Sequence, residues 1–127
     1  MNLESASELV VNLAKEFVTL VERLDPTWIR AFWRFESEEA RYGSNASYDS
    51  PGGIFLIGAI KEGAAYERMN ELGRQLWGAE RDPSKRFCVC LLVIDCSLDY
   101  ELKFEQQDIR KWKITKTNGA TGIPADL

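Results

Sequence analysis

The stretch from Phe87 to Glu105, FCVCLLVIDCSLDYELKFE, limits most strongly what this chain can fold into. From Phe87 to Ile94 it contains no charged side chain, and such a run is short for a helix but fits a strand that is buried on both faces. Turn-forming residues follow, and after them apolar and charged residues alternate up to Glu105. A period of two is typical of a strand with one apolar and one solvated face. The stretch therefore predicts a β-hairpin made of a central strand and a half-exposed one.

A different period, near the N-terminus, predicts an amphipathic helix. Apolar residues recur there at steps of three and four, which places them on one face of a helix. Ser5 and Glu8 have the spacing of a capping box, and Asp25–Pro26 ends the pattern because the residue before proline avoids the helical region. The apolar stripe consists of Leu9, Val10, Leu13, Phe17, Leu20, Val21 and Leu24.

Two further stretches predict strands. Residues 28–36, WIRAFWRFE, alternate between an apolar face, which we expect to pack on the helix, and a face that mixes aromatic residues with arginines. The mixed face fits either a covered sheet surface or a docking surface, since arginine stems can lie flat on aromatic rings. Residues 54–60, IFLIGAI, predict a second, fully apolar strand.

A second amphipathic helix follows this strand. Gly73 lies inside it, where a glycine costs about 1 kcal/mol relative to alanine, and therefore predicts close packing at that position. The apolar stripe of this helix consists of Ala65, Met69, Leu72, Leu76 and Trp77.

The segment from Ser37 to Gly53 is rich in Ser, Gly, Asn and Asp and predicts a loop, with at most a short, irregular edge strand. Acidic residues and tyrosines gather in and next to it, and a tyrosine ring gives a large contact area at low entropy cost. The segment is therefore a candidate protein-binding loop, although a solvated hairpin tip fits the same residues. The candidate contact residues are Glu36, Glu38, Glu39, Tyr42, Tyr48 and Asp49.

Short connections between successive strands favour an antiparallel meander, and two helices with single apolar stripes can cover one of its faces. We therefore expect an α+β, two-layer sandwich, with an antiparallel β-sheet of about five strands and two main helices packed on one face. Residues 1–115 are expected to form this single domain, and residues 109–115, IRKWKIT, fit either a strand or a helical turn. Residues 116–127 have low hydrophobicity and are expected to form a flexible C-terminal tail.

The composition excludes several kinds of chemistry. The chain has 127 residues and no histidine, which rules out Ser-His and Cys-His pairs, and it contains no Gly-rich phosphate loop. Cys88 and Cys90 are expected to lie on the same face of one strand as unbridged thiols, because a Cys-x-Cys metal site would have only Cys96 as a further cysteine ligand. We expect no catalytic residues, no metal and no cofactor.

Charge and hydropathy bear on location and partners. No stretch is apolar enough to span a membrane and the first residues lack a signal pattern, so we expect a cytoplasmic protein without membrane contact. The formal net charge is -4, from 20 acidic and 16 basic residues, and the negative charge is concentrated in the first half of the chain. An acidic surface disfavours direct binding of nucleic acid and favours a basic protein partner, although it also fits a merely solvated surface.

With this order of elements, the sequence resembles the YezG-like immunity proteins of bacterial polymorphic toxin systems, within the broader group that includes immunity proteins of contact-dependent growth inhibition. The similarity extends over residues 9–114. It is carried by the acidic first helix, by WIRAFWRFE, by IFLIGAI with the helix AAYERMNELGRQLW, and by the hairpin with its closing DIRKWK. The chain departs from the family pattern at Cys96–Ser97–Leu98, which stands in place of a glycine turn, and in lacking an aromatic residue directly after Phe104.

The resemblance implies a non-enzymatic inhibitor that binds the C-terminal toxin domain of a cognate effector in the cytosol. Such a toxin is often a basic nuclease, and complementary charge would speed the encounter. The alternative is a small acidic secretion chaperone, which would bind an unfolded effector segment through a long apolar groove. An enzyme is a third alternative and would need a carboxylate pair, such as Glu36 and Glu38, inside a cleft. The oligomeric state is left open.

Overall fold

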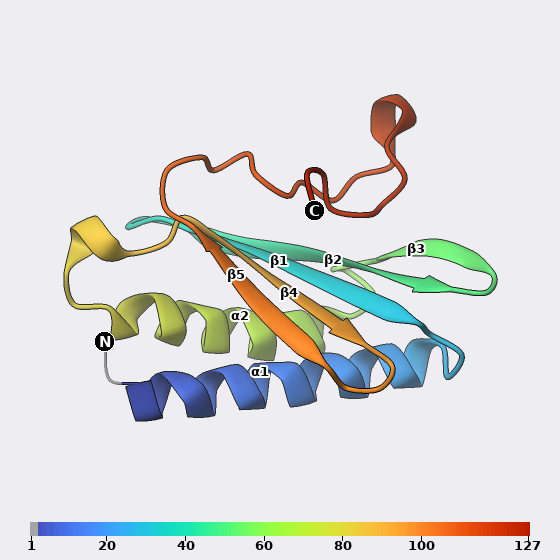
Figure 1. The fold of residues 1–127 in the computed structure, drawn as a ribbon, viewed down its shortest axis with the longest axis horizontal. Helices are drawn as coiled ribbons and strands as arrows, with labels where there is room; N and C mark the ends of the chain where they lie inside the picture. Colours follow the sequence, from blue (N-terminus) through green and yellow to red (C-terminus); the bar gives the residue numbers. More distant parts are fainter. Residues whose placement is uncertain (1–2) are drawn as a thin grey trace.

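The computed structural model describes residues 3–127 and shows a sheet between two unlike layers (Figure 1). Two helices lie side by side on one face of an antiparallel sheet of five strands, which confirms the expected α+β class. The C-terminal segment crosses the opposite face. The elements are α1 (Leu3–Leu24), β1 (Arg30–Ser37), β2 (Tyr42–Ser50), β3 (Gly53–Ile57), α2 (Gly63–Ala79), the short 3₁₀ helix η1 (Pro83–Lys85), β4 (Val89–Asp95), β5 (Tyr100–Glu105) and the 3₁₀ turn η2 (Thr117–Gly119).

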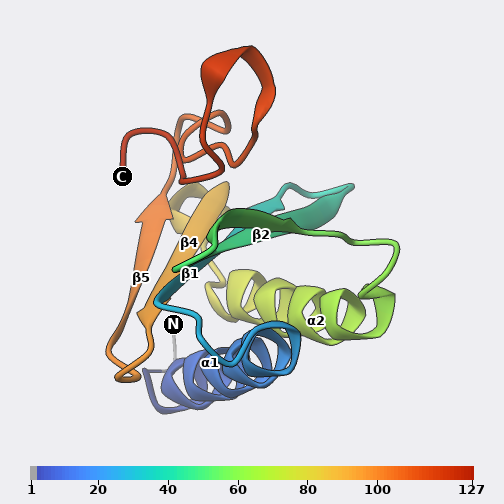
Figure 2. The same cartoon turned by 90° about the vertical axis from the view of Figure 1, so that its right-hand side faces the viewer.

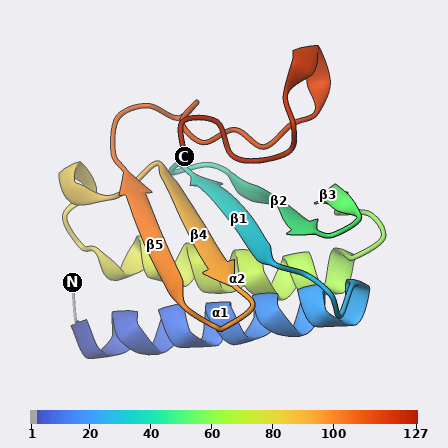
Figure 3. The ribbon, with the colours of Figure 1, turned by 45° about the vertical axis from the view of Figure 1, so that its right-hand side comes forward.

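The strand order is β3-β2-β1-β4-β5, so β1 is the central strand (Figure 3). The first three strands form the expected meander, but α2 then carries the chain back and β4 pairs with the other edge of β1. The predicted hairpin is confirmed, since β4 and β5 pair antiparallel with Cys90 opposite Phe104. β4 is buried along most of its length, as expected, whereas Tyr100 and Phe104 of the edge strand β5 are exposed.

Both amphipathic stripes face the sheet, as their periodicity predicts. Leu13 and Phe17 of α1 and Met69 and Leu76 of α2 are fully buried. They share one core cluster with the helix side of the sheet, where Trp33 is central and fully buried. The helices are therefore fixed to the sheet by apolar burial, each residue of this size contributing about 1.5–3 kcal/mol.

The opposite face of the sheet is also apolar, and residues 106–127 cover it (Figure 2). Phe32 of β1 and Leu91 of β4 are fully buried there together with Trp112 and Ile114 of the covering segment. Of the two interpretations open for the mixed aromatic and arginine face of β1, a covered sheet surface is the one observed.

Arg34 links this cover to β1. Its Nε donates to the backbone C=O of Lys111 at 2.7 Å, and Nη2 donates to the C=O of Ile109 at 2.5 Å. Its Nη1 forms an ion pair with Glu36. The Arg34 side chain is almost fully buried, and these partners compensate for the water that its charge has lost.

Residues 116–127, for which we expected a flexible tail, continue the cover and have defined contacts. The Ser47 hydroxyl donates to the C=O of Gly122 at 2.6 Å, and the N–H of Ala125 donates to the C=O of Lys113 at 3.0 Å. The segment contributes backbone groups to both contacts. Its low hydrophobicity therefore does not predict them. The preceding IRKWKIT stretch, which we could not assign, forms turns and irregular backbone rather than a strand or a helix.

Two predictions about where strands lie are wrong. Residues 42–50, predicted as a loop, form β2, which pairs with β1 along its whole length. The apolar run 54–60 forms only the short edge strand β3, in which Phe55 and Leu56 are exposed, because the chain turns away after Ile57 to enter α2.

Two expectations about which face a side chain occupies are also wrong. Cys90 is buried on the helix side, but Cys88 precedes β4 and packs against the cluster on the opposite side. Ile29, expected on the apolar face, precedes β1 and is exposed, whereas its neighbour Trp28 is buried in the main core. In both cases the period of two fails because the residue lies outside the regular strand.

Candidate protein-binding surface

The acidic candidates gather at the turn between β1 and β2, and α2 holds this turn in place. Glu36 lies near the end of β1, and Glu38 and Glu39 follow in the turn. The guanidinium of Arg74, on α2, donates to the backbone C=O groups of Glu38 and Glu39 and to the hydroxyl of Ser37, the last two at 2.7 Å. The carboxylates of Glu38 and Glu39 therefore project from a turn whose backbone is anchored to a helix.

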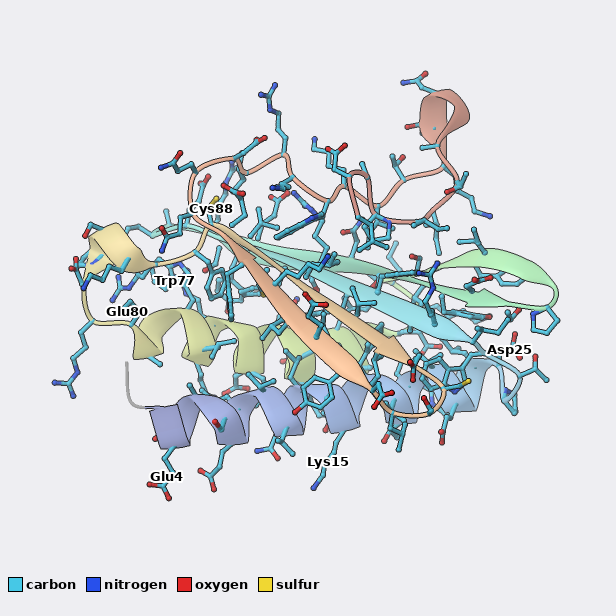
Figure 4. The ribbon with its side chains drawn as sticks, in the orientation of Figure 1. Glu4, Lys15, Asp25, Trp77, Glu80 and Cys88 are labelled. Carbon is cyan, nitrogen blue, oxygen red and sulfur yellow. The ribbon has the colours of Figure 1, made fainter. Side chains whose placement is uncertain are left out.

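Tyr42 lies beside this turn, and the residue is 51% exposed. Its ring centroid is 4.9 Å from the guanidinium carbon of Arg74, which also lies 4.2 Å from the ring centroid of Trp77. Trp77 is labelled in Figure 4, near the C-terminal end of α2. Arg86 lies over the same indole at 4.4 Å and reaches Glu39, with 3.4 Å between nitrogen and oxygen. These stacked cations and rings hold Tyr42 and the turn in one arrangement before any partner binds.

One ion pair at the tip is exposed on both sides. Glu38 pairs with Arg41 at 3.2 Å, and both side chains are well exposed. Exposed pairs of this kind contribute about 0–1 kcal/mol. If a cation of a partner protein took the place of Arg41 beside Glu38, the loss of the Arg41 ion pair would therefore cost little free energy.

The structure brings together four of the six predicted contact residues, Glu36, Glu38, Glu39 and Tyr42. Tyr48 and Asp49 lie toward the other end of β2, about 20 Å from Tyr42 along the strand. Tyr48 is 9% exposed and packs on Phe55, with 5.4 Å between the ring centroids, so it belongs to the core side of the sheet. Asp49 is half-buried and does not extend the acidic tip.

Two acidic residues that the sequence analysis did not single out, Glu67 and Glu71 of α2, lie beside the same surface. With Tyr42 and Asn70 they line a hollow of about 600 Å³ between α2 and the start of β2. Within residues 3–127 neither forms an ion pair. Their spacing of four predicts that they share a helix face. Their position beside β2 depends on long-range packing, which the sequence does not reveal.

A second hollow, of about 440 Å³, lies between α1 and the turn of the β4–β5 hairpin and is mainly apolar. Val11 and Val18 of α1 line it together with Leu98 and Tyr100. Leu98 has a φ of 72°, in the left-handed region that leucine rarely adopts. Tyr100 of β5 thus borders an open hollow and Phe104 is exposed, whereas the sequence predicted that both would lie on a buried face. Leu102, between them, packs against the main core as predicted.

The carboxylates considered for catalysis, Glu36 and Glu38, each face an arginine, Arg34 and Arg41 respectively. In the described part of the chain, no three Cys, Asp or Glu side chains are close enough together to hold a metal ion. No helix of that part has the length and apolarity needed to cross a bilayer.

The chain matches no protein-family model, and no curated protein is similar to it at a significant level. The resemblance to the YezG-like immunity proteins therefore stays an expectation. The acidic turn and the two hollows are the features from which function can be inferred.

Proposed function

We propose that this protein is an immunity protein that binds and neutralises a basic toxin domain. The observation that carries the proposal is the acidic turn, where Glu38 and Glu39 are fixed by Arg74 beside the exposed ring of Tyr42. An aromatic anchor beside a charged rim is a frequent arrangement in protein interfaces. The family resemblance supplies the kind of partner, a folded toxin domain that is often a nuclease. Inhibition requires binding alone, so no catalytic group is assigned.

Surface plasmon resonance against the toxin domain encoded beside the gene tests the role of charge. Replacing Glu38 and Glu39 with Ser should slow association several-fold and flatten its dependence on salt, because rim charges act mainly on encounter over a Debye length of about 8 Å. Dissociation should change less. Asp49→Ser is the matched control, since it removes one acid outside the tip and should leave both rates unchanged.

Tyr42 is expected to act on dissociation. Tyr42→Ala removes the exposed ring and should speed dissociation about tenfold or more, as truncation of an interface anchor does. Tyr42→Phe keeps the ring and its stacking on Arg74 and should retain most of the affinity. If both acids and Tyr42 can be replaced without any change in rates, the interface lies elsewhere. If the unmodified protein does not bind the folded domain, the proposed function is wrong.

A secretion chaperone is the second candidate, and the apolar hollow between α1 and the β4–β5 turn favours it. An unfolded effector segment could bury apolar side chains against Val18 and Tyr100 there. In that case the protein would bind the unfolded partner and not the folded domain. Val18→Ser would then abolish binding, while substitution of Glu38 and Glu39 would leave it unchanged.

A further inference from the structure

β3 is shorter than the strand with which it pairs, and this leaves half of β2 without a neighbour. β3 pairs with β2 only from Ala46 to Ser50. The stretch from Tyr42 to Asn45 has β1 on one side and no strand on the other. We call this stretch the β2 notch, and it is about 13 Å long.

The hydrogen bonding of the β1–β2 turn shows which backbone groups face the notch. The N–H of Glu38 donates to the C=O of Arg41 at 2.8 Å, so these residues form the first hydrogen-bonded pair of the hairpin. Because such pairs alternate along an antiparallel ladder, Gly43 directs its N–H and C=O toward β1. Tyr42 and Ser44 then direct theirs away from β1, into the notch.

At the other end of the notch, the β2–β3 ladder shows the same alternation in the direction of the β2 backbone groups. Ala46 pairs with Ile57, the last residue of β3, and the Tyr66 hydroxyl donates to the C=O of Ile57 at 2.6 Å. Tyr66 thus closes the β2–β3 ladder where β3 ends. The next outward-facing residue along β2 is Ser44.

The backbone groups of Tyr42 and Ser44 that face the notch have no backbone partner there among residues 3–127. The Ser44 side chain does not cover them, because its hydroxyl donates to Oδ1 of Asn70 on α2. A row of unpaired N–H and C=O groups is a template for pairing with another strand.

Hollows lie on both sides of this edge. On the helix side is the hollow of about 600 Å³ lined by Tyr42 and α2. On the opposite side, a hollow of about 320 Å³ is lined by Ser44, Asn45, Lys113 and Thr115, among others. Successive side chains of a strand point to opposite faces. A strand laid along the β2 notch would therefore direct alternate side chains toward one hollow and then the other.

Charge indicates which side chains suit each hollow. Glu67 and Glu71 on the helix side have no ion-pair partner within residues 3–127, while the nearby guanidinium of Arg74 is already bound to the β1–β2 turn. That hollow favours lysine or arginine. On the other side, Arg34 and Glu36 also line the hollow but pair with each other. The remaining polar lining, Asn45, Lys113 and Thr115, favours small polar side chains.

We infer that the β2 notch takes an extended segment of the partner protein as an added strand, with basic side chains at alternate positions facing Glu67 and Glu71. The inference rests on the proposed function for the identity of the partner and adds the manner of its binding. Backbone hydrogen bonds supply the register, and the two glutamates supply the charge preference.

The test uses the full chain and a short synthetic peptide that alternates lysine and threonine. NMR of the ¹⁵N-labelled protein should show shift changes centred on the β2 notch and at least tenfold slower amide exchange at Ser44. The same peptide with N-methyl groups on the edge-facing residues should bind at least tenfold more weakly, because it lacks the N–H donors. Binding of both peptides with equal affinity, or shift changes spread over all acidic surfaces, would overturn the inference.

Variants of the protein give a second readout. Ser44→Pro removes the outward N–H and should weaken peptide binding at least tenfold, while Ser44→Ala removes only the bond to Asn70 and should keep it. Glu67→Lys with Glu71→Lys should abolish binding of the lysine peptide and permit binding of the matching glutamate peptide. Glu8→Lys with Glu22→Lys is the control, because it makes the same charge change on exposed positions of α1. Equal effects of the two double variants would contradict the assigned site.

The two proposals can fail separately. If the lysine peptide does not bind while the toxin domain binds through the acidic turn, the added strand is wrong and the immunity function stands. If the peptide binds at the notch while the folded toxin domain does not bind, the proposed function is wrong and the notch remains a strand-binding edge.

Discussion

Gly73 of α2 lies directly against Trp33 of β1, so that a Cβ added at Gly73 would be 2.9 Å from Cη2 of the indole. Two atoms of the Phe35 ring would be 3.1 Å from the same Cβ. The close packing predicted from this glycine is confirmed. Helix and sheet approach to this distance because residue 73 has no side chain.

We expect Gly73→Ala to lower the free energy of unfolding, because the two aromatic rings must move to admit the methyl group, at a cost of about 1–3 kcal/mol. This loss should exceed the gain of about 1 kcal/mol that alanine brings to a helix. Gly78→Ala is the control in the same helix, since an added Cβ there meets no atom within 4 Å, and it should stabilise. Urea unfolding measures both, and effects of the same sign would contradict the packing argument.

Leu98 is expected to lower stability in its present conformation. It occupies the left-handed position of the β4–β5 turn, where glycine is usual, and its side chain is exposed. Leu98→Gly should therefore raise the melting temperature, since a left-handed residue with a Cβ costs about 1–2 kcal/mol. Leu98→Ala should not, because it removes the leucine contacts and keeps a Cβ at positive φ. If both variants melt at the same temperature, the backbone conformation is not the cause.

Stability should fall in acid partly through Asp95. Its carboxylate accepts hydrogen bonds from the hydroxyl and N–H of Ser97 and from the N–H of Asp99, and these hold the pKa of Asp95 below its ordinary value of 3.8. Because the pKa of Asp95 is lower in the folded chain than in the unfolded chain, its contribution to stability is complete above the unfolded pKa. That contribution is lost as the pH falls through the folded pKa. Asp95→Asn should be less stable at pH 7 and depend less on pH below about 4. Thermal melts across pH measure this, and parallel curves would contradict it.

The C-terminal cover should contribute to the stability of the sheet. Trp112 is buried over Phe32 and Leu91, so Trp112→Ala should cost about 3–5 kcal/mol. Lys113→Ala, one residue further on and exposed, should change stability little. Hydrogen exchange on the unmodified protein should also show protection at Gly122 and Ala125, whose N–H groups are bonded within the cover. Equal exchange rates at these amides and in an unfolded chain would show that the cover is mobile.

The three thiols should differ in reactivity. Burial raises the pKa of the Cys90 thiol, which is fully enclosed, and also that of the half-buried Cys88 thiol. Cys96 is exposed. Because the thiolate is the reactive form, a thiol reagent should modify Cys96 first and Cys90 only on unfolding. Cys96→Ser should remove the fast phase. Intact mass measurement would also reveal a disulfide or a bound zinc, which we do not expect.

The elements that the sequence predicted well are those whose burial follows a single period. Phe17 and Met69 lie in helical stripes, and Leu91 lies in an uninterrupted apolar run, so local pattern and final environment agree. β2 was missed because Ser44, Asn45 and their neighbours have low strand propensity, and pairing with β1 overrides it.

At the candidate site, the cluster of Glu38, Glu39 and Tyr42 follows from closeness in sequence. Arg74 and Glu67 could not be assigned to it, because their approach to the β1–β2 turn depends on how α2 packs on the sheet. Tyr48 was misplaced for a related reason. A strand alternates its side chains between faces, and a segment taken for a loop carries no such constraint.

The position of β1 between β2 and β4 has a consequence for synthesis on the ribosome. β2 emerges directly after β1 and can pair with it at once, but the other edge of β1 stays bare until residues 89–95 have also emerged. During that interval the nascent chain exposes an aromatic strand edge, Phe32, Trp33 and Phe35 included, that could pair with other chains. Slow translation between α2 and β4 would lengthen this exposure, so synonymous codon changes there should alter the yield of native protein without altering its sequence.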